Sequence, residues 1–535
     1  MKRDVDQLTA RTFDVLVVGG GIYGLTIAYD AAQRGLAVAL VEAEDFGSGA
    51  TFNHLRTLHG GLRYLQSLDL KRARESVRER RTLARIAPHA VQPLVFALPT
   101  RRTPTRGKLA MRAGFLLDRL VSLGRNRGLV ASHALPGGRV VSRGTAIQRF
   151  PGLRRQGLTG AAVWHDYEAT EADRLTLSWA IAAAEHGATI ANHVEAVAPI
   201  ADGRRVTGVR ARDRQSGREL DIAACVTVNA TGAALDRLLA PLGLSARVPL
   251  LKAMNLVTRR DAGEEALGGV SPSGRTLFLV PWRGRALFGT WESDRACAAD
   301  ALAIVEDEVG AFIAELNHAF PSLDLKRADV TLVHRGVVPA VEHGGRVRLQ
   351  GHEQVRDHAS EGVEGLISVA GAKYTTARAS AERVTDRVMA KLGQAGTPSR
   401  TAATPLPGGG LRDVGLTIAE ARREHDVGLP SDTIPHLVGA YGSRYREILE
   451  VAAKRPEWRT RIADDSPVIG AQLVWAVRHE MAMTLRDAAL RRTPLGATQY
   501  PGDAAAERAA RIVGSELGWS EERVRKEVAD LKDFY

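Results

Sequence analysis

The sequence contains little of what disulfide-bonded, metal-clustered or membrane-spanning proteins require. It has only two cysteines, Cys225 and Cys297, in 535 residues, which excludes a disulfide framework and a cysteine-based metal cluster and suits a reducing compartment. No uninterrupted apolar run reaches the roughly 18 residues that a membrane-spanning helix needs. Residues 1–11 are polar and lack the apolar core of a signal peptide, so we expect a cytoplasmic protein, and we predict no metal site.

Charge is the unusual feature of the composition. Hydrophobic residues make up 44% and charged residues 25% of the chain, as in ordinary globular proteins, and the length predicts two or three domains. The net charge of +12 fits an anionic small substrate, an anionic lipid surface, nucleic acid, or a general arginine bias of the composition. No helix-turn-helix, zinc finger or RNA-binding module is recognisable, so we expect no nucleic-acid partner.

The first elements predict a β-α-β unit. Residues 14–18 form a β-branched run, residues 25–32 follow a helical pattern that stops at Arg34 and Gly35, and residues 37–41 form a second apolar run. Glycine suits the left-handed position after a helix. A strand, a helix and a second buried strand in this order favour a parallel sheet.

The turn before this helix carries a nucleotide-binding signature. Gly19, Gly21 and Gly24 have G-x-G-x-x-G spacing, and Glu42 closes the second strand. The glycines allow a tight turn and close approach of the backbone to a pyrophosphate, the helix N-terminus attracts phosphate, and the carboxylate accepts hydrogen bonds from ribose hydroxyls. We therefore predict a dinucleotide site, and this motif alone leaves FAD and NAD open.

Later strands indicate how the nucleotide-binding domain is assembled. Residues 224–228 lead toward Gly232, and residues 365–370 lead into Gly371, so similar strands return far along the chain, as is typical of flavoproteins. The predicted fold class is α/β. It comprises an FAD-binding Rossmann-like domain interleaved with a β-rich substrate or cap domain, followed by an all-helical C-terminal domain.

Helical periodicity replaces the strand signals after about residue 405. Leu473, Val477, Met481 and Leu485 share one face of a predicted helical segment that ends at Gly496. Ser520 is the predicted start of a further helix. We expect an oxidoreductase domain over residues 12–400 and a helical domain over residues 401–535. Within the first, the nucleotide-binding pieces are 12–100, 160–245 and 360–395, and the cap pieces are 101–159 and 246–359.

Several motifs resemble the FAD-dependent glycerol-3-phosphate dehydrogenase family, in its aerobic, quinone-linked type. The clearest is His-Gly-Gly-Leu-Arg-Tyr-Leu at residues 59–65, preceded by Ala-Thr at residues 50–51. The resemblance covers about residues 13–500. Further similar segments follow in the same order at residues 86–89, 228–232, 280–282, 371–378, 477–480 and 490–493.

The resemblance implies oxidation of sn-glycerol 3-phosphate to dihydroxyacetone phosphate, with FAD as cofactor and electrons passed to quinone or another acceptor. It implies catalytic roles for His59, Arg63, Tyr64 and Lys373. Arginine binds phosphate bidentately and lysine adds a point charge, while His59 is either the base for the hydroxyl proton or a contact of the flavin. The implied cofactor-binding residues are Gly19, Gly21, Gly24, Glu42, Thr51, Gly60, Val194, Gly232, Gly371 and Thr375.

The chain departs from the family pattern in the expected substrate pocket. The usual Gly-Val-Arg-Pro reads Gly-Val-Val-Pro at residues 336–339, so Val338 replaces an arginine expected near the phosphate. The usual Lys-Gly-x-His ends in Asn255, and the usual Gly-Thr-Thr-Asp ends in Glu292. Losing one phosphate arginine weakens binding by about 1.5–3 kcal/mol. Arg335, beside the vacant position, or Arg56 is the expected replacement.

The resemblance also bears on partners. The basic segment at residues 101–127 resembles the region by which such dehydrogenases sit on a membrane and reach quinone, and an ordinary solvated helix is the alternative. This implies peripheral binding to the inner face of the cytoplasmic membrane, and a homodimer stays open. Another polyol phosphate or hydroxy compound, an amine or amino-acid oxidase, and an inactive flavin-binding protein remain as alternative functions.

Overall fold

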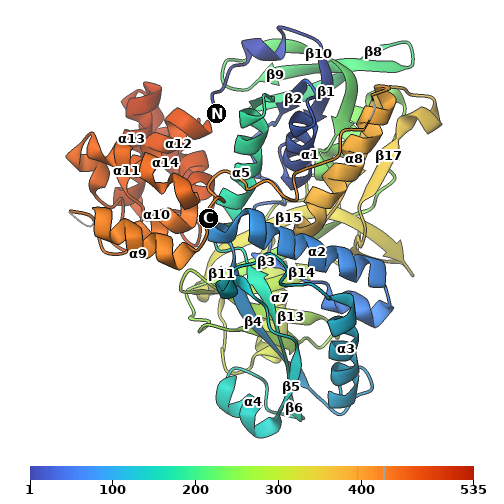
Figure 1. The fold of residues 1–535 in the computed structure, drawn as a ribbon, viewed down its shortest axis with the longest axis vertical. Helices are drawn as coiled ribbons and strands as arrows, with labels where there is room; N and C mark the ends of the chain where they lie inside the picture. Colours follow the sequence, from blue (N-terminus) through green and yellow to red (C-terminus); the bar gives the residue numbers. More distant parts are fainter. Residues whose placement is uncertain (395, 426–427) are drawn as a thin grey trace.

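The computed structural model describes residues 1–394, 396–425 and 428–535, with the side chains of residues 63, 66 and 425 outside the description. Two β-sheets lie one above the other, and a helical region packs against both (Figure 1). Across the described ranges, no helix is long and apolar enough to cross a bilayer.

The first sheet is built around β1 (Phe13–Val18), whose apolar residues are all buried. Parallel strands covered on both faces need such nearly continuous apolar runs. Neighbours pair in parallel except where β17 meets β18. Across the sheet the order is β17 (Gln354–Asp357), β18 (Leu366–Ala370), β10 (Glu219–Asn229), β1, β2 (Val38–Val41) and β7 (Thr189–Ala191), with β8 (Val194–Asp202) and β9 (Arg205–Asp213) extending β10 as an antiparallel meander.

Three helices cover one face of this sheet. Helix α1 (Ile22–Gln33) lies between α5 (Ala172–Glu185) and α8 (Ala377–Lys391) and contacts both, as Figure 1 shows. The rings of Tyr29 and Trp179 pack with centroids 5.7 Å apart between α1 and α5. The sequence thus brings three segments, hundreds of residues apart, into one nucleotide-binding domain.

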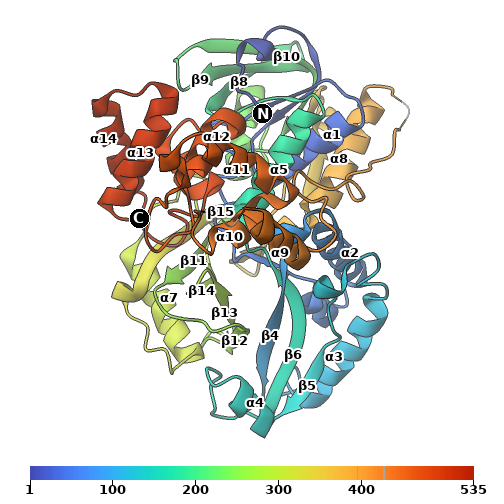
Figure 2. The same cartoon turned by 60° about the vertical axis from the view of Figure 1, so that its left-hand side comes forward.

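The second sheet is mostly antiparallel and forms the lower half of the molecule (Figure 2). Across it the order is β16 (Arg346–Leu349), β15 (Val330–His343), β11 (Leu250–Thr258), β14 (Arg285–Glu292), β13 (Thr276–Trp282), β12 (Ala266–Val270), β4 (Gln92–Thr100), β6 (Gly160–Glu168) and β3 (Thr57–Leu58), with β5 (Arg139–Ser142) also on β6. Its helices are α2 (Leu70–Ile86), α3 (Lys108–Val121), α4 (Arg143–Arg149) and α7 (Glu306–Ala319).

The second sheet contains strands from segments that the sequence analysis assigned to the nucleotide-binding domain. Strands β4 and β6 fall inside the pieces 12–100 and 160–245 that the sequence suggested for nucleotide binding, but they pair with each other along their whole length in the second sheet. The reason is that β4 and β6 are half-apolar strands joined across α3, so their pairing is non-local. Local periodicity does not reveal such pairing.

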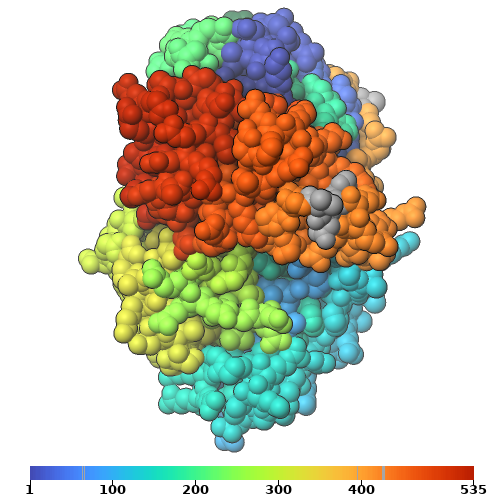
Figure 3. Space-filling view, turned by 90° about the vertical axis from the view of Figure 1, so that its left-hand side faces the viewer, coloured from blue at the N-terminus to red at the C-terminus, as the bar shows by residue number. Residues whose placement is uncertain are grey.

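The C-terminal region is helical, as expected. Its helices are α9 (Val414–His425), α10 (Thr433–Tyr441), α11 (Tyr445–Ala453), α12 (Gly470–Glu480), α13 (Asp503–Leu517) and α14 (Glu521–Lys532). They cover the junction between the two sheets, in orange and red in Figure 3. Ser520 caps α14, because its side chain accepts a hydrogen bond from the backbone N–H of Arg523.

One helical prediction here was wrong in its extent. Leu473, Met481 and Leu485 are buried in the same region, but α12 ends at Glu480, and Met481 has a left-handed backbone with φ of 56°. The Arg492 guanidinium donates to the Glu480 carbonyl at 3.0 Å, so that carbonyl is satisfied outside the helix. The chain then turns into a short π-helix at Asp487–Arg492.

Candidate active site and cofactor cradle

The turn from β1 to α1 has the geometry of a phosphate cradle. Gly19 has φ of 105°, and a Cβ there would lie 2.6 Å from the Ala230 carbonyl oxygen. A Cβ on Gly24 would lie 1.8 Å from the Gly19 oxygen. Only glycine fits both positions. The N-cap residue Gly21 makes no side-chain capping bond to helix α1, and the first turn has no acidic residue, which suits an anion.

The residues around this turn fit the adenosine and pyrophosphate parts of FAD. The Glu42 carboxylate accepts hydrogen bonds from the backbone N–H groups of Gly20 at 2.5 Å and Glu44 at 2.8 Å. Burial raises the pKa of Glu42, and these two bonds oppose the rise. The Thr51 hydroxyl accepts from Ile22 N at 3.0 Å, and Val194 N donates to the Glu42 carbonyl at 2.8 Å.

The remaining predicted cofactor residues meet at the same edge of the sheet. Gly232 follows β10 with φ of 62° and open space at its Cβ position. Gly371 follows β18, and a Cβ there would lie 2.2 Å from the Tyr23 ring of α1. Thr375 is buried in the short helix η9 (Tyr374–Thr376) that leads into α8. The arrangement therefore fits a dinucleotide at the carboxyl ends of β1, β10 and β18.

His59 is held by a carboxylate from a distant strand. Its Nδ1 lies 3.2 Å from Asp166 Oδ2 on β6, and its Nε2 lies 2.9 Å from the Thr57 hydroxyl. Asp166 also accepts from Gly60 N at 2.8 Å and pairs with Arg80. Burial favours the neutral acid, but Arg80, His59 and the Gly60 N–H outweigh it and lower the pKa of Asp166 to about 2. The ionised carboxylate fixes the imidazole, a pairing typical of a histidine base.

Tyr64 and Lys373 lie beside this turn. Lys373 Nζ lies 4.5 Å from the centroid of the Tyr64 ring and donates to the Ser76 hydroxyl. Burial, and secondly the charge of Arg72, lower the pKa of Lys373 to about 7. The Tyr23 hydroxyl donates to the Lys373 carbonyl at 3.2 Å, which ties this lysine to the cofactor helix. The Arg63 side chain lies outside the described residues, so its role stays a prediction.

Arg335 is oriented away from these groups. Its Nε donates to the Leu302 carbonyl at 2.8 Å, and its Cζ lies 5.9 Å from the Phe534 ring centroid. Successive side chains of a strand point to opposite faces, and the neighbouring Gly336 faces Ala50, 3.2 Å from its Cβ position. Arg335 is therefore directed to the other face of β15, and we do not carry it forward as a substrate residue.

Two family models together match most of this chain. Residues 14–387 match the FAD dependent oxidoreductase family, and residues 399–524 match the C-terminal domain of alpha-glycerophosphate oxidase. The glycerol-3-phosphate dehydrogenase of Synechocystis is 31% identical, over 99% of this chain and 98% of that protein. The chain belongs to the FAD-dependent glycerol-3-phosphate dehydrogenase family. It is an FAD-dependent oxidoreductase.

Other members of the family give the same result. The glycerol-3-phosphate dehydrogenase of Mycobacterium leprae is 33% identical, over 98% of this chain and 88% of that protein. The crystal structure of the Bacillus halodurans glycerol-3-phosphate dehydrogenase complexed with FAD superposes with a TM-score of 0.77 at 26% identity, over 99% of this chain and 96% of that one. The predicted fold class is thereby confirmed, including the helical C-terminal region.

The departures from the family pattern have structural roles of their own. Val338 packs against an apolar group formed by Leu251, Ala340 and Val347. Asn255 Nδ2 donates to the Asn53 carbonyl at 2.8 Å, and its Oδ1 accepts from the Thr290 hydroxyl at 2.9 Å. Asn255 therefore ties β11 to the loop after the cofactor turn, Val338 packs within the second sheet, and neither supplies a cation.

Arg56 also differs from the predicted role. It is fully buried, its Cζ lies 4.7 Å from the Trp282 ring and 5.1 Å from the Phe52 ring, and its Nη1 pairs with Asp173 at 2.7 Å. Its guanidinium thus anchors the loop after the cofactor turn to α5. We assign Arg56 to this packing and not to the substrate.

The sequence interpretation missed Asp166, Arg80, Ser76 and Arg72. Asp166 stands in Trp-His-Asp on β6, 107 residues from His59, and the other three stand in a helix whose charges look like an ordinary solvated face. The sequence offers only a weak signal, the one-turn spacing of Arg72, Ser76 and Arg80, and the structure shows that all three are buried.

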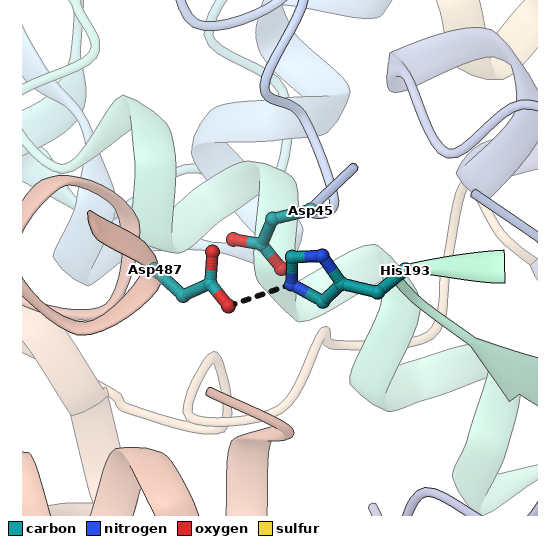
Figure 4. A group of neighbouring side chains, drawn as sticks. All are labelled: Asp45, His193 and Asp487. Carbon is teal, nitrogen blue, oxygen red and sulfur yellow. Dashed lines mark hydrogen bonds and ion pairs between the residues drawn. The ribbon is translucent and has the colours of Figure 1, made fainter. Parts of the chain in front are cut away.

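A second cluster of acids and histidine lies between the domains. Asp45, His193 and Asp487 face one another in Figure 4, and their ligand atoms lie within 4.8 Å. Two buried guanidiniums are already paired with these carboxylates: Arg492 with Asp45 at 2.7 Å, and Arg491 with both acids, at 2.5 and 2.8 Å. The cluster is therefore a charge network that joins the nucleotide-binding domain to the C-terminal region.

Proposed function

We propose that this dehydrogenase oxidises sn-glycerol 3-phosphate to dihydroxyacetone phosphate. Bound FAD would supply the hydride acceptor for the hydrogen on the secondary alcohol carbon. Nε2 of His59 takes the hydroxyl proton, because Asp166 holds the proton on Nδ1 and leaves Nε2 as the acceptor. The Thr57 hydroxyl keeps that nitrogen in place until the substrate hydroxyl arrives.

The observation that carries the proposal is the grouping of a carboxylate-held histidine with cationic side chains next to the cofactor cradle. His59 is 40% exposed in its side chain, so its ring is accessible, whereas its partner Asp166 is buried. Lys373 and Tyr64 stand beside the same turn. A base for an alcohol proton and donors for an anion are the two requirements of this reaction.

The test is anaerobic mixing of the holoenzyme with sn-glycerol 3-phosphate while the flavin absorbance is followed. Bleaching at millimolar substrate or below is the expected result. If the flavin bleaches with dithionite but not with this substrate, the substrate assignment is wrong while the cofactor assignment stands. Because Val338 replaces an arginine expected near the phosphate, other polyol phosphates and hydroxy acids are tested in the same assay.

The α3 surface supports a second proposal, that the enzyme binds an anionic membrane and passes electrons to quinone there. Leu109, Leu116, Leu120 and Leu123 are each more than 60% exposed, and their spacing places them on one side of α3 and its end. Arg112 and Arg119 flank this stripe. Leucines with basic flanks suit the interface of an anionic bilayer.

An open cavity adjoins the start of this helix. It has a volume of about 770 Å³ and is lined by Arg101, Arg102, Lys108 and Arg143, among others. Co-sedimentation with vesicles containing anionic lipid tests the proposal. Leu116→Glu with Leu120→Glu is expected to abolish binding, whereas Leu416→Glu, which changes an equally exposed leucine on α9, leaves it intact. Equal binding of both variants would contradict the membrane assignment.

A further inference from the structure

Arg72 is a buried arginine on the side of α2 that faces the candidate site. The residue is only 8% exposed, and its Cζ lies 4.0 Å from the centroid of the Tyr64 ring. Among the described residues, its guanidinium has no carboxylate partner. A buried guanidinium is normally paired, because an uncompensated charge in the interior is costly.

The acids around Arg72 are all engaged with other cations. Asp69 pairs with His352 at 2.8 Å. Glu75 pairs with Arg383 at 2.7 Å, and Glu353 pairs with the same arginine. Arg72 therefore keeps its charge available, and the partner it lacks is an anion that the chain itself does not provide.

A second cation lies on the same aromatic ring. Lys373 Nζ is 4.5 Å and Arg72 Cζ is 4.0 Å from the Tyr64 centroid. Ser76, one turn along α2, accepts from Lys373 Nζ and donates to the Arg72 carbonyl at 2.8 Å. Two positive groups on one ring, each without a carboxylate partner among the described residues, suit a multiply charged anion.

A series of contacts connects Arg72 to position 338 on β15, where the arginine of the family pattern is missing. Its Nη1 lies so close to Gly351 that a Cβ there would be 2.3 Å away. The preceding residue, Gln350, donates its backbone N–H to the Pro339 carbonyl at 3.0 Å. Pro339 directly follows Val338. Arg72 thus contacts a segment that is hydrogen-bonded to the residue after position 338, where the family pattern has an arginine.

We propose that Arg72, together with Lys373, forms the anion subsite of the substrate pocket and replaces the arginine missing at position 338. The group it binds is a phosphate monoester on a small polyol, since a guanidinium fork and an ammonium together match a tetrahedral dianion. This inference rests on the proposed function for the identity of the reaction, but anion binding can be measured without turnover.

The first experiment is calorimetric titration of the holoenzyme with inorganic phosphate. Arg72→Met is expected to weaken binding about 10- to 150-fold, the loss of a charged hydrogen-bond partner. The matched control is Arg78→Met, an exposed arginine on the same helix, which leaves the dissociation constant unchanged. Arg72→Gln, which keeps most of the side-chain length, serves if the methionine variant does not fold. An unchanged phosphate affinity in a folded, FAD-loaded Arg72 variant overturns the inference.

The second experiment removes the positive charge at position 72 and then introduces one at position 338. Arg72→Met is expected to raise KM for sn-glycerol 3-phosphate by a similar factor while kcat changes less than about threefold, and adding Val338→Arg is expected to recover at least tenfold of the loss. A kcat loss with unchanged KM would overturn the subsite. If the wild-type enzyme does not oxidise this substrate at all, the proposed function fails, and the phosphate titration still decides the role of Arg72.

Discussion

Asp166 holds His59 across 107 residues of sequence, with Oδ2 at 3.2 Å from the ring Nδ1. The same carboxylate accepts the backbone N–H of Gly60 at 2.8 Å, so it fixes both the ring and the turn that carries it. Arg80 on α2 balances its charge. The orientation of the proposed base thus depends on a strand of the second sheet, and the turn alone does not set it.

Replacing Asp166 with asparagine should slow catalysis without removing the histidine. The amide would present an N–H where the carboxylate accepts one, which favours the wrong tautomer. We expect the rate of anaerobic flavin reduction to fall at least about 100-fold. In a His59→Gln background, adding Asp166→Asn should slow flavin reduction far less than about 100-fold, because the main effect of Asp166 is on His59. Additive losses in that double variant would contradict this role.

Substrate affinity should depend on pH through Lys373. Because burial and Arg72 lower its pKa to about 7, the ammonium is present below that pH and is lost as pH rises above it. KM for an anionic substrate should therefore increase between about pH 7 and 9, by at most about tenfold per unit. In Lys373→Arg the charge persists throughout, so KM should stay flat. A flat profile in the wild-type enzyme would contradict the prediction.

Gly24→Ala should abolish cofactor binding. The new Cβ would lie 1.8 Å from the Gly19 carbonyl oxygen, so the phosphate turn must shift. We expect the purified variant to contain almost no FAD by absorbance. Gly114→Ala on α3, where the Cβ position is open, should retain the full FAD content. Normal FAD content in the Gly24 variant would show that the turn does not hold the cofactor.

The charge network between the domains should contribute strongly to stability. Asp45→Asn leaves Arg491 and Arg492 buried with one carboxylate fewer, and breaking such a pair costs about 3–5 kcal/mol. The thermal and urea midpoints should fall accordingly. Glu521→Gln breaks the exposed pair with Arg511 and should cost at most about 1 kcal/mol. Equal shifts of these midpoints in the two variants would contradict this assignment.

The parts that could be predicted from the sequence are those set by neighbours in the chain. The spacing of Gly19, Gly21, Gly24 and Glu42 defines one β-α-β unit, and the structure has that unit. Asp166 could not be predicted, because its contact with His59 depends on how β6 pairs with β3 and β4. Likewise, the end of α12 at Met481 depends on the distant Arg492, against an unbroken helical pattern.

The positively charged residues of the substrate pocket show the same limit of prediction from the sequence. Arg335 was expected in the pocket because it lies three residues before Val338, but alternation along β15 directs it to the opposite face. Arg72 lies 266 positions from Val338 in sequence and was hidden among the arginines of α2. Its burial and lack of a carboxylate partner are properties of the folded chain, and composition does not report them.

The loop after β2 carries Asp45 near one end and Thr51 near the other, and Gly47 N binds the Gly20 carbonyl at 2.9 Å. One short stretch therefore contacts both the cofactor cradle and the π-helix of the C-terminal region. We therefore expect loss of the Asp45 pairs with Arg491 and Arg492 to weaken the hold on FAD as well as the stability of the C-terminal region.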